Sequence, residues 1–358
     1  MSIKSDAGLP DRKSKPFYES QFGQEREKYK VLGNSFFRAG KPIKKENTEN
    51  IIEEYQTVDP DWTPQQIYEE FNKHVYGLDN YKRAVSVLIW KALNGYKPKG
   101  ALLVVGQSGS GKTELLRVLE KIYPLMRVAD GSSVIHSGYR NGEQGIKAPM
   151  YYLSTQRKAY PDLKPIFVID EFDKLLDNNK GSNAKGNMDA IPELYRMIEG
   201  NKVTVQVNRD DGIRDFDTDD FIFIFTGSFA SSTGNRSAAM GFTSDNSAHA
   251  KNSKVPTLDE VNKQLTPEMR GRIEDIIISE EFNKQDYINI LNSNLYSPIK
   301  KIGKEYGVKI TATEQFIDKM ATEAYDSGVG VRLLNSAVMR RLNELLFKNP
   351  NVKSMKLK

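Results

Sequence analysis

Cysteine is absent from the 358-residue sequence, which excludes disulfide bonds and metal sites built from thiolates. The sequence also lacks an apolar run long enough to cross a membrane, and residues 1–15 have no apolar core of the kind found in signal peptides. These absences agree with a reducing compartment, so we expect a cytoplasmic protein with no membrane partner.

A strong excess of one charge is absent as well. Lys and Arg number 52 against 47 Asp and Glu, which gives a formal net charge of +5. Proteins that bind nucleic acids usually carry a basic face or a basic run, so we do not expect a nucleic-acid partner. His74, His136 and His249 show no spacing typical of a metal site or a catalytic base, and we expect them to be structural or solvent-facing.

The strongest signal present lies in residues 101–123, ALLVVGQSGSGKTELLRVLEKIY. A short apolar run predicts a buried strand, and the apolar residues near its end recur with the period of a helix. The turn between them fits G-x-x-x-x-G-K-[ST], in which backbone N–H groups and the lysine bind phosphates and the hydroxyl holds Mg²⁺. We expect a nucleoside triphosphate to contact Gly106, Gln107, Ser108, Gly109, Ser110, Gly111, Lys112 and Thr113.

A second diagnostic segment is KPIFVIDEFDKLL, residues 164–176. Its apolar residues predict a buried parallel strand that ends in Asp170 and Glu171. We expect Asp170 to hold Mg²⁺ together with the Thr113 hydroxyl, and Glu171 to polarise the attacking water. An acidic pair after an apolar strand is common in proteins. At this distance from a phosphate loop, however, it specifically indicates a nucleotide-hydrolysing site.

Two further segments predict contacts with the nucleotide. The apolar strand within residues 220–230 ends in Thr226 and Ser228, and a hydroxyl there can orient the water or contact the terminal phosphate. The alternative is that both hydroxyls only cap the strand. A helix begins after Thr63, and Val75 and Tyr76 follow it, where such a segment can close over the base. Ordinary packing is the alternative for that pair.

The remaining patterns predict an α/β fold in two domains. A polar extension at residues 1–60, partly disordered or used for docking, precedes a large domain at 61–282 with a five-stranded parallel sheet flanked by helices. A smaller, mainly helical domain at 283–358 follows, with helices at about 284–306, 312–326 and 330–347 and short strands near 308–310 and 352–358.

Taken together, these motifs resemble the AAA+ protein unfoldases of the ClpX type, to which HslU is also related. The similarity extends from about Val75 to the C-terminus and keeps the family's order and spacing through VYGLDNYKRAVSV, GQSGSGKT, ADGSSVIHSGYRN, IFVIDEFDKL, PELYRMIEG, DTDDFIFIFTGSFA and TPEMRGR. The resemblance implies a homo-hexameric ring that hydrolyses ATP with Mg²⁺ and threads protein substrates through a central pore. The family's N-terminal zinc domain is not expected, because cysteine is absent.

The resemblance also implies roles for two arginines. Arg272, at the end of TPEMRGR, corresponds to the arginine finger that reaches the nucleotide of a neighbouring subunit. The structural alternative is a pairing with Glu268 or Glu274. Arg332 fits the V-R-x-L form of the sensor-two element, whereas an exposed helix charge is its alternative.

Two loops correspond to substrate and partner contacts of the family. Gly138, Tyr139 and Arg140 occupy the place of the pore loop, where an aromatic ring grips the polypeptide; Arg140 and Asn141 depart from the family pattern. Within a long polar loop, Met240, Gly241 and Phe242 correspond to the segment that docks on a ClpP-type peptidase.

Three functional hypotheses follow. The first is an ATP-driven protein unfoldase or remodelling chaperone. The second is a nucleic-acid motor or loader on the same fold, against which the aromatic pore loop and the balanced charge argue. The third is a nucleotide-dependent assembly scaffold without processive unfolding, which the presence of Asp170, Glu171 and Arg272 disfavours.

Overall fold

The computed structural model describes residues 55–107, 109–132, 146–178, 190–206, 212–230 and 255–358. These residues belong to one compact unit that starts at position 54. Several residues predicted to be functional lie outside the described part, namely Ser108, Gly138, Tyr139, Arg140, Met240, Gly241 and Phe242. His136 and His249 lie outside it as well.

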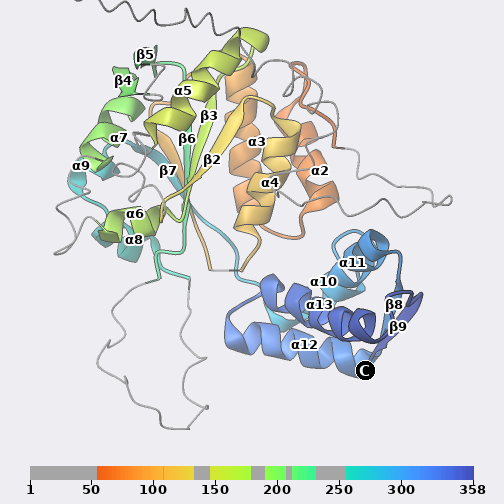
Figure 1. The fold of residues 1–358 in the computed structure, drawn as a ribbon. Coiled ribbons are helices and arrows are strands. Elements are labelled where there is room, and N and C mark those ends of the chain that lie inside the picture. The colour runs from red at the N-terminus through yellow and green to blue at the C-terminus, as the bar shows by residue number, and fades with distance from the viewer. Residues whose placement is uncertain (1–54, 108, 133–145, 179–189, 207–211, 231–254) are drawn as a thin grey trace, which may run out of the picture. The chain divides into compact units, whose positions relative to one another are not determined.

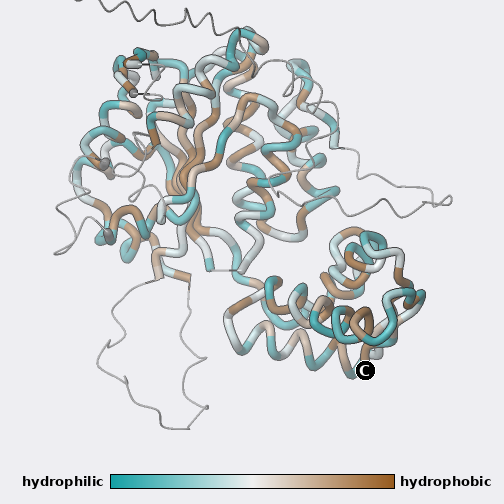
Figure 2. The backbone as a smooth tube through the Cα atoms, in the orientation of Figure 1, coloured by the Kyte–Doolittle hydropathy of each residue, from teal (hydrophilic) through white to brown (hydrophobic). Residues whose placement is uncertain are grey.

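The centre of the structure is a five-stranded parallel sheet in the order β2-β3-β6-β1-β7. The strands are β1 (Ala101–Val105), β2 (Met126–Asp130), β3 (Ile166–Asp170), β6 (Ile222–Gly227) and β7 (Ile273–Ile278). The inner strands β1, β3 and β6 are almost wholly buried, as expected of apolar runs in a parallel sheet. Figure 2 shows this apolar centre, and the predicted sheet is confirmed.

Helices pack on the sheet (Figure 1). On one side lie α2 (Pro64–His74), α3 (Asp79–Leu93) and α4 (Lys112–Ile122). The other helices of this region are α5 (Lys147–Gln156), α6 (Phe172–Asn178), α7 (Ala190–Ile198), α8 (Leu258–Gln264) and α9 (Pro267–Arg270). Thr63 caps α2 through a hydrogen bond from the Gln66 N–H, with Pro64 at the first helical position, as the sequence predicts.

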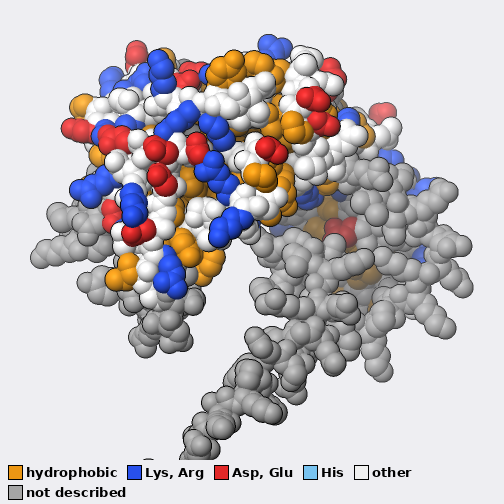
Figure 3. All heavy atoms as spheres, turned by 90° about the horizontal axis from the view of Figure 1, so that it is seen from above, with side chains coloured by type: hydrophobic (Ala, Val, Ile, Leu, Met, Phe, Trp, Pro, Cys, Tyr) orange, Lys and Arg blue, Asp and Glu red, His pale blue; other side chains and the backbone are white. Residues whose placement is uncertain are grey.

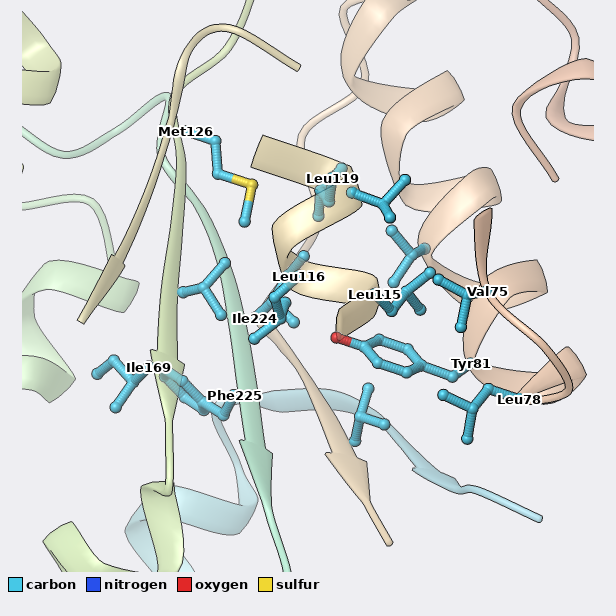
Figure 4. Packing of buried hydrophobic residues seen from close by; sticks show 14 of the residues in the cluster. Val75, Leu78, Tyr81, Leu115, Leu116, Leu119, Met126, Ile169, Ile224 and Phe225 are labelled. Atoms are coloured by element: carbon cyan, nitrogen blue, oxygen red, sulfur yellow. The ribbon is translucent and has the colours of Figure 1, made fainter. Parts of the chain in front are cut away.

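The helix α4 connects the phosphate loop to the core. Its apolar residues Leu115, Leu116 and Leu119 are buried between the sheet and the α2–α3 region (Figure 4). Tyr81 of α3 is fully buried on the same side. Burial of this face fixes the start of α4, and therefore the loop before it, relative to the carboxyl edge of the sheet.

Several elements of this region were not predicted, among them α5 and the strands β4 (Lys202–Gln206) and β5 (Ile213–Asp217). Helix α5 presents no clear apolar stripe and buries only Ala148, Met150 and Leu153. The antiparallel pair of β4 and β5 is separate from the main sheet. The strand β5 buries one residue of its five, so its sequence IRDFD carries almost no apolar signal.

The C-terminal part is a small domain of four helices and two short strands among the described residues. The helices are α10 (Lys284–Asn292), α11 (Pro298–Tyr306), α12 (Glu314–Ser327) and α13 (Val331–Lys348). The strands β8 (Lys309–Ala312) and β9 (Ser354–Leu357) pair in parallel. The single helix predicted over 284–306 is wrong, because Pro298 starts a new helix and cannot continue the previous one.

Within the described residues, no helix is both long and apolar enough to cross a membrane.

Candidate functional site: a nucleotide cavity at the carboxyl edge of the sheet

A cavity of about 390 Å³ lies where the phosphate loop, the strand ends and the start of α13 meet. The strands β1, β3 and β6 run in parallel, so their carboxyl ends meet at this edge, where α/β proteins bind ligands. Of the predicted site residues, the cavity is lined by Val75, Tyr76, Gly109, Ser110, Gly111, Lys112, Thr113, Asp170, Glu171 and Arg332.

The phosphate loop holds its lysine through its own carbonyl oxygens. Gly111 adopts a φ of 101° just before α4, a conformation that favours glycine, and Lys112 begins the helix. The Lys112 ammonium donates to the carbonyl oxygens of Gly106 at 2.5 Å and Gln107 at 2.8 Å. Burial lowers the pKa of Lys112 to about 8, because a desolvated ammonium is less stable.

The donors of this loop fit a chain of phosphates. The Ser110 hydroxyl is buried and has no hydrogen-bond partner within the described ranges. The N-terminus of α4 contributes the positive end of its dipole at the same point. Together with the Lys112 ammonium, these groups form a set of donors for which phosphate oxygens are suitable acceptors.

Asp170 connects two strands and the phosphate loop. One of its oxygens accepts a hydrogen bond from the Thr113 hydroxyl at 3.0 Å, and the other accepts one from the Thr226 hydroxyl at 2.5 Å. Thr226 is fully buried and does not line the cavity, whereas Ser228 does. The Thr226 hydroxyl therefore orients the carboxylate in this structure.

The arrangement of Thr113 and Asp170 is compatible with Mg²⁺. In the part of the chain that the structure describes, no group of three or more His, Asp or Glu side chains could hold a metal ion without further ligands. Mg²⁺ usually binds one or two protein oxygens plus phosphates and water. Thr113 and Asp170 would be its protein contacts, and the ion would neutralise phosphate charge when bound.

Glu171 lines the cavity with an exposed side chain. Its backbone has a φ of 55°, which is unusual for a residue with a side chain, and its N–H donates to the Asp170 carboxylate at 3.0 Å. Such strain persists only where the surrounding structure determines it. An exposed carboxylate at this point can accept a proton from a water molecule.

Asp173 is a cavity residue that sequence reasoning missed. Its buried carboxylate accepts hydrogen bonds from the Ser228 hydroxyl at 2.8 Å and from the N–H groups of Ser228 and Phe229, both at 3.3 Å. It therefore fixes the loop after β6 against the start of α6. The only sequence signal was its place two residues after Glu171, which does not distinguish it from an ordinary helix charge.

The segment after α2 forms another part of the cavity. Val75 and Tyr76, for which the sequence predicts a place near the base, both line it. The buried Lys82 ammonium donates to the Val75 carbonyl at 2.6 Å, and the Tyr76 hydroxyl donates to Asp286 at 3.0 Å. The backbone of this segment is thus held from α3, and its tyrosine is held from α10.

The turn between α12 and α13 brings Arg332 to the cavity. The N–H of Val331 donates to the carbonyl of Gly109 in the phosphate loop at 3.2 Å. A Cβ on Gly330 would lie 2.6 Å from the Gly109 oxygen, so this close approach requires glycine. The charge of Arg332 contributes to lowering the pKa of Lys112, after the larger effect of burial.

Arg272 does not line the cavity of its own chain. Its carbonyl accepts from the Ala101 N–H at 2.8 Å, so it lies beside the start of β1, while the phosphate loop follows the end of that strand. At roughly 3.3 Å per residue, these points are about 16 Å apart. Its guanidinium pairs with Glu199, donates to the Glu268 carbonyl and stacks on Tyr195 at 4.6 Å.

The sequence is similar to known families and proteins. Residues 97–276 match the family described as AAA domain (Cdc48 subfamily), and residues 282–356 match the C-terminal, D2-small domain, of ClpB protein. The ATP-dependent Clp protease ATP-binding subunit ClpX of Treponema denticola is 26% identical over 356 residues, which cover 86% of this chain and 84% of that protein.

Two other Clp proteins are also similar to this chain. ClpX 2 of Wolinella succinogenes is 28% identical over 323 residues, with 80% of this chain and 78% of that protein covered. The chaperone protein ClpB of Oceanobacillus iheyensis is 24% identical over 300 residues, covering 76% of this chain and 33% of that longer protein.

The fold and the cavity therefore define an AAA+ ATPase, an enzyme that binds and hydrolyses ATP. More narrowly, the chain belongs to the AAA domain (Cdc48 subfamily) family and is of the ClpX/ClpB type, within the Clp group of chaperones and unfoldases.

Proposed function

We propose that the protein is an ATP-dependent unfoldase that assembles into a homo-hexameric ring and threads polypeptide through its pore. The observation that carries this proposal is the position of Arg272, about 16 Å along β1 from the phosphate loop of its own chain at roughly 3.3 Å per residue. The extended reach of an arginine side chain is much shorter than that. An arginine finger at this position serves a neighbouring subunit.

In the proposed site, one chain supplies the phosphate-binding and metal-binding residues. Lys112 and the loop N–H groups bind the triphosphate, Thr113 and Asp170 hold Mg²⁺, and Glu171 accepts a proton from the attacking water. Arg332 contacts the phosphates from the small domain. Arg272 of the adjacent copy stabilises the charge that develops on the transferred phosphoryl group.

The substrate is proposed to be protein. Tyr139, with Gly138 and Arg140, corresponds to the pore loop of ClpX-type unfoldases, and Met240, Gly241 and Phe242 correspond to their peptidase-docking segment; all six lie outside the described residues. Two of the similar proteins are by name ATP-binding subunits of a Clp protease. Feeding a ClpP-type peptidase is part of this proposal.

The charge distribution supports a protein substrate over a nucleic acid. On the face shown in Figure 3, basic and acidic side chains of the described residues intermingle. The formal net charge of +5 over 358 residues is small. A nucleic-acid motor would need a concentrated basic path for the phosphate backbone.

We also propose domain boundaries from the packing. Val58 is buried and its N–H donates to the Ile122 carbonyl at 2.8 Å, so we propose that the large domain includes residues at least from Val58. The boundary with the small domain is placed at 282/283, where Asn283 caps α10.

The function is tested by the ATP-dependent loss of fluorescence from a folded reporter protein that carries an unstructured tail. We expect the wild-type protein to unfold it. Tyr139→Ala should lose at least about ten-fold in unfolding rate while its ATPase rate stays within about two-fold, because the tyrosine side chain grips the substrate but does not touch the nucleotide. The matched control is Tyr306→Ala, an exposed tyrosine of α11. Unfolding without ATP, or full unfolding by Tyr139→Ala, would contradict the pore mechanism.

A further inference from the structure

At the end of the cavity formed by the last turn of α2, several polar groups already have hydrogen-bond partners within the chain. The Val75 N–H donates to the Phe71 carbonyl at 3.0 Å, and the Val75 carbonyl accepts from Lys82 at 2.6 Å. The Tyr76 hydroxyl donates to Asp286, and the Tyr296 hydroxyl donates to a backbone carbonyl. Each of these groups therefore already makes at least one hydrogen bond within the chain.

His74 differs from them. It lines the cavity and is 8% exposed, and its Nε2 lies 3.2 Å from a Glu70 carboxylate oxygen. Tyr55 stacks on the imidazole with ring centroids 4.2 Å apart. The other ring nitrogen, Nδ1, has no hydrogen-bond partner among the residues that the structure describes. The imidazole is thus fixed in orientation with one nitrogen available.

Glu70 determines which nitrogen of His74 carries the proton. Burial alone would raise the pKa of Glu70, but hydrogen bonds from Lys73, His74 and the Gln56 N–H outweigh it and lower that pKa. The carboxylate is therefore ionised and can only accept hydrogen bonds. His74 Nε2 must donate to it, so in the neutral imidazole Nδ1 is an acceptor.

We propose that His74 Nδ1 accepts a hydrogen bond from the exocyclic amino group of the nucleotide base, so that the Glu70–His74 pair selects adenine. Hypoxanthine and guanine carry a carbonyl oxygen at the same ring position. That oxygen and Nδ1 are both acceptors, and a buried acceptor without a donor is unfavourable. This inference rests on the proposed nucleotide cavity and adds a residue that determines its base specificity.

ATP and ITP make the sharpest pair of probes, since inosine has the carbonyl where adenosine has the amino group. Equilibrium affinities of both nucleotides are measured at pH 7.5 for the wild-type protein, His74→Phe, Glu70→Gln and Gln65→Ala. Phenylalanine retains the stacking on Tyr55 and removes both nitrogens. Gln65 is an exposed residue of the same helix and serves as the matched control.

We expect the wild-type protein and Gln65→Ala to bind ATP at least about ten-fold more tightly than ITP. In His74→Phe the ratio of ATP affinity to ITP affinity should fall to about two-fold or less, mainly through loss of ATP affinity. Glu70→Gln should also lower the ratio, because an amide can donate to Nε2 and leave Nδ1 protonated.

An unchanged ratio in both variants, or equal affinities in the wild-type protein, would overturn the role of His74. Equal losses for ATP and ITP in His74→Phe would do the same, since they indicate packing alone. If the wild-type protein bound neither nucleotide, the nucleotide cavity itself would be refuted, and this inference with it. The two failures are therefore distinguishable.

Discussion

The ammonium of Lys112 is buried among carbonyl oxygens and close to Asp170, and burial brings its pKa to about 8. A triphosphate beside it favours the charged form and raises that pKa in the complex. A group whose pKa rises on binding contributes affinity that is fully present below the pKa of the free protein and is lost as the pH rises through the pKa of the complex.

We therefore expect ATP affinity to be constant near pH 7 and to fall above pH 8, by about ten-fold per pH unit at most. The phosphates do not contribute in this range, because their last pKa is about 6. The measurement is the equilibrium dissociation constant between pH 7.5 and 9.5, with Lys82→Met as a control for the other buried lysine, whose pKa is also lowered to about 8. A flat profile would contradict the account.

At this scale the sequence predicted that residues of the phosphate loop and the acidic pair would lie together at one cavity, because their spacing is set by a local strand and turn. It did not predict Asp173 or His74. Their significance depends on partners far along the chain or on a buried neighbour, such as the 55-residue separation between Asp173 and Ser228. No local pattern carries that information.

Among the elements, the turn between α12 and α13 is the one that links the small domain to the phosphate loop. Gly109 and Gly330 meet there with φ values of 77° and 67°. A Cβ on Gly330 would press on the Gly109 carbonyl, whereas Gly307, with a φ of 65° in the same small domain, has no atom within 4 Å of an added Cβ.

This difference gives a matched pair of variants. We expect Gly307→Ala to lower Tm by about 2–4 °C, since it forces an alanine into the left-handed region. Gly330→Ala should lower Tm further, because its φ of 67° and ψ of −144° are open essentially to glycine alone and its Cβ would meet the Gly109 carbonyl. Only Gly330→Ala should also weaken ATP binding, by roughly ten-fold, because it displaces the loop that surrounds the phosphates. Differential scanning fluorimetry and a binding titration measure both effects. Equal ATP affinities in the two variants would exclude the proposed contact.

The elements that the sequence predicted well are those whose apolar period is strong. The buried strands β1, β3 and β6 and the capped helix α2 belong to this group. The pair of β4 and β5 was missed, because β5 buries only one residue and the two buried valines of β4 are too few for a clear strand signal. The sequence does carry a signal for the break before α11, because Pro298 cannot continue a preceding helix.

At the scale of the whole molecule, the central claim is that each ATP site is shared between two copies of the chain. The phosphate loop and Asp170 lie at one edge of the sheet, and Arg272 lies near the other. In its own chain Arg272 pairs with Glu199 and stacks on Tyr195, and we propose that it serves the site of a neighbouring copy. A ring with such sites hydrolyses ATP only at interfaces where both contributions are intact.

Mixing inactive subunits tests this claim most directly. Lys112→Ala and Arg272→Ala proteins should each lose at least about a hundred-fold in ATPase rate. An equimolar mixture, allowed to exchange subunits, should recover about a quarter of the wild-type rate, because random neighbours leave that share of interfaces intact. A mixture of Lys112→Ala with Asp170→Ala should recover nothing, since both residues serve the same chain's site. If the first mixture stays as inactive as its components, the shared site is refuted.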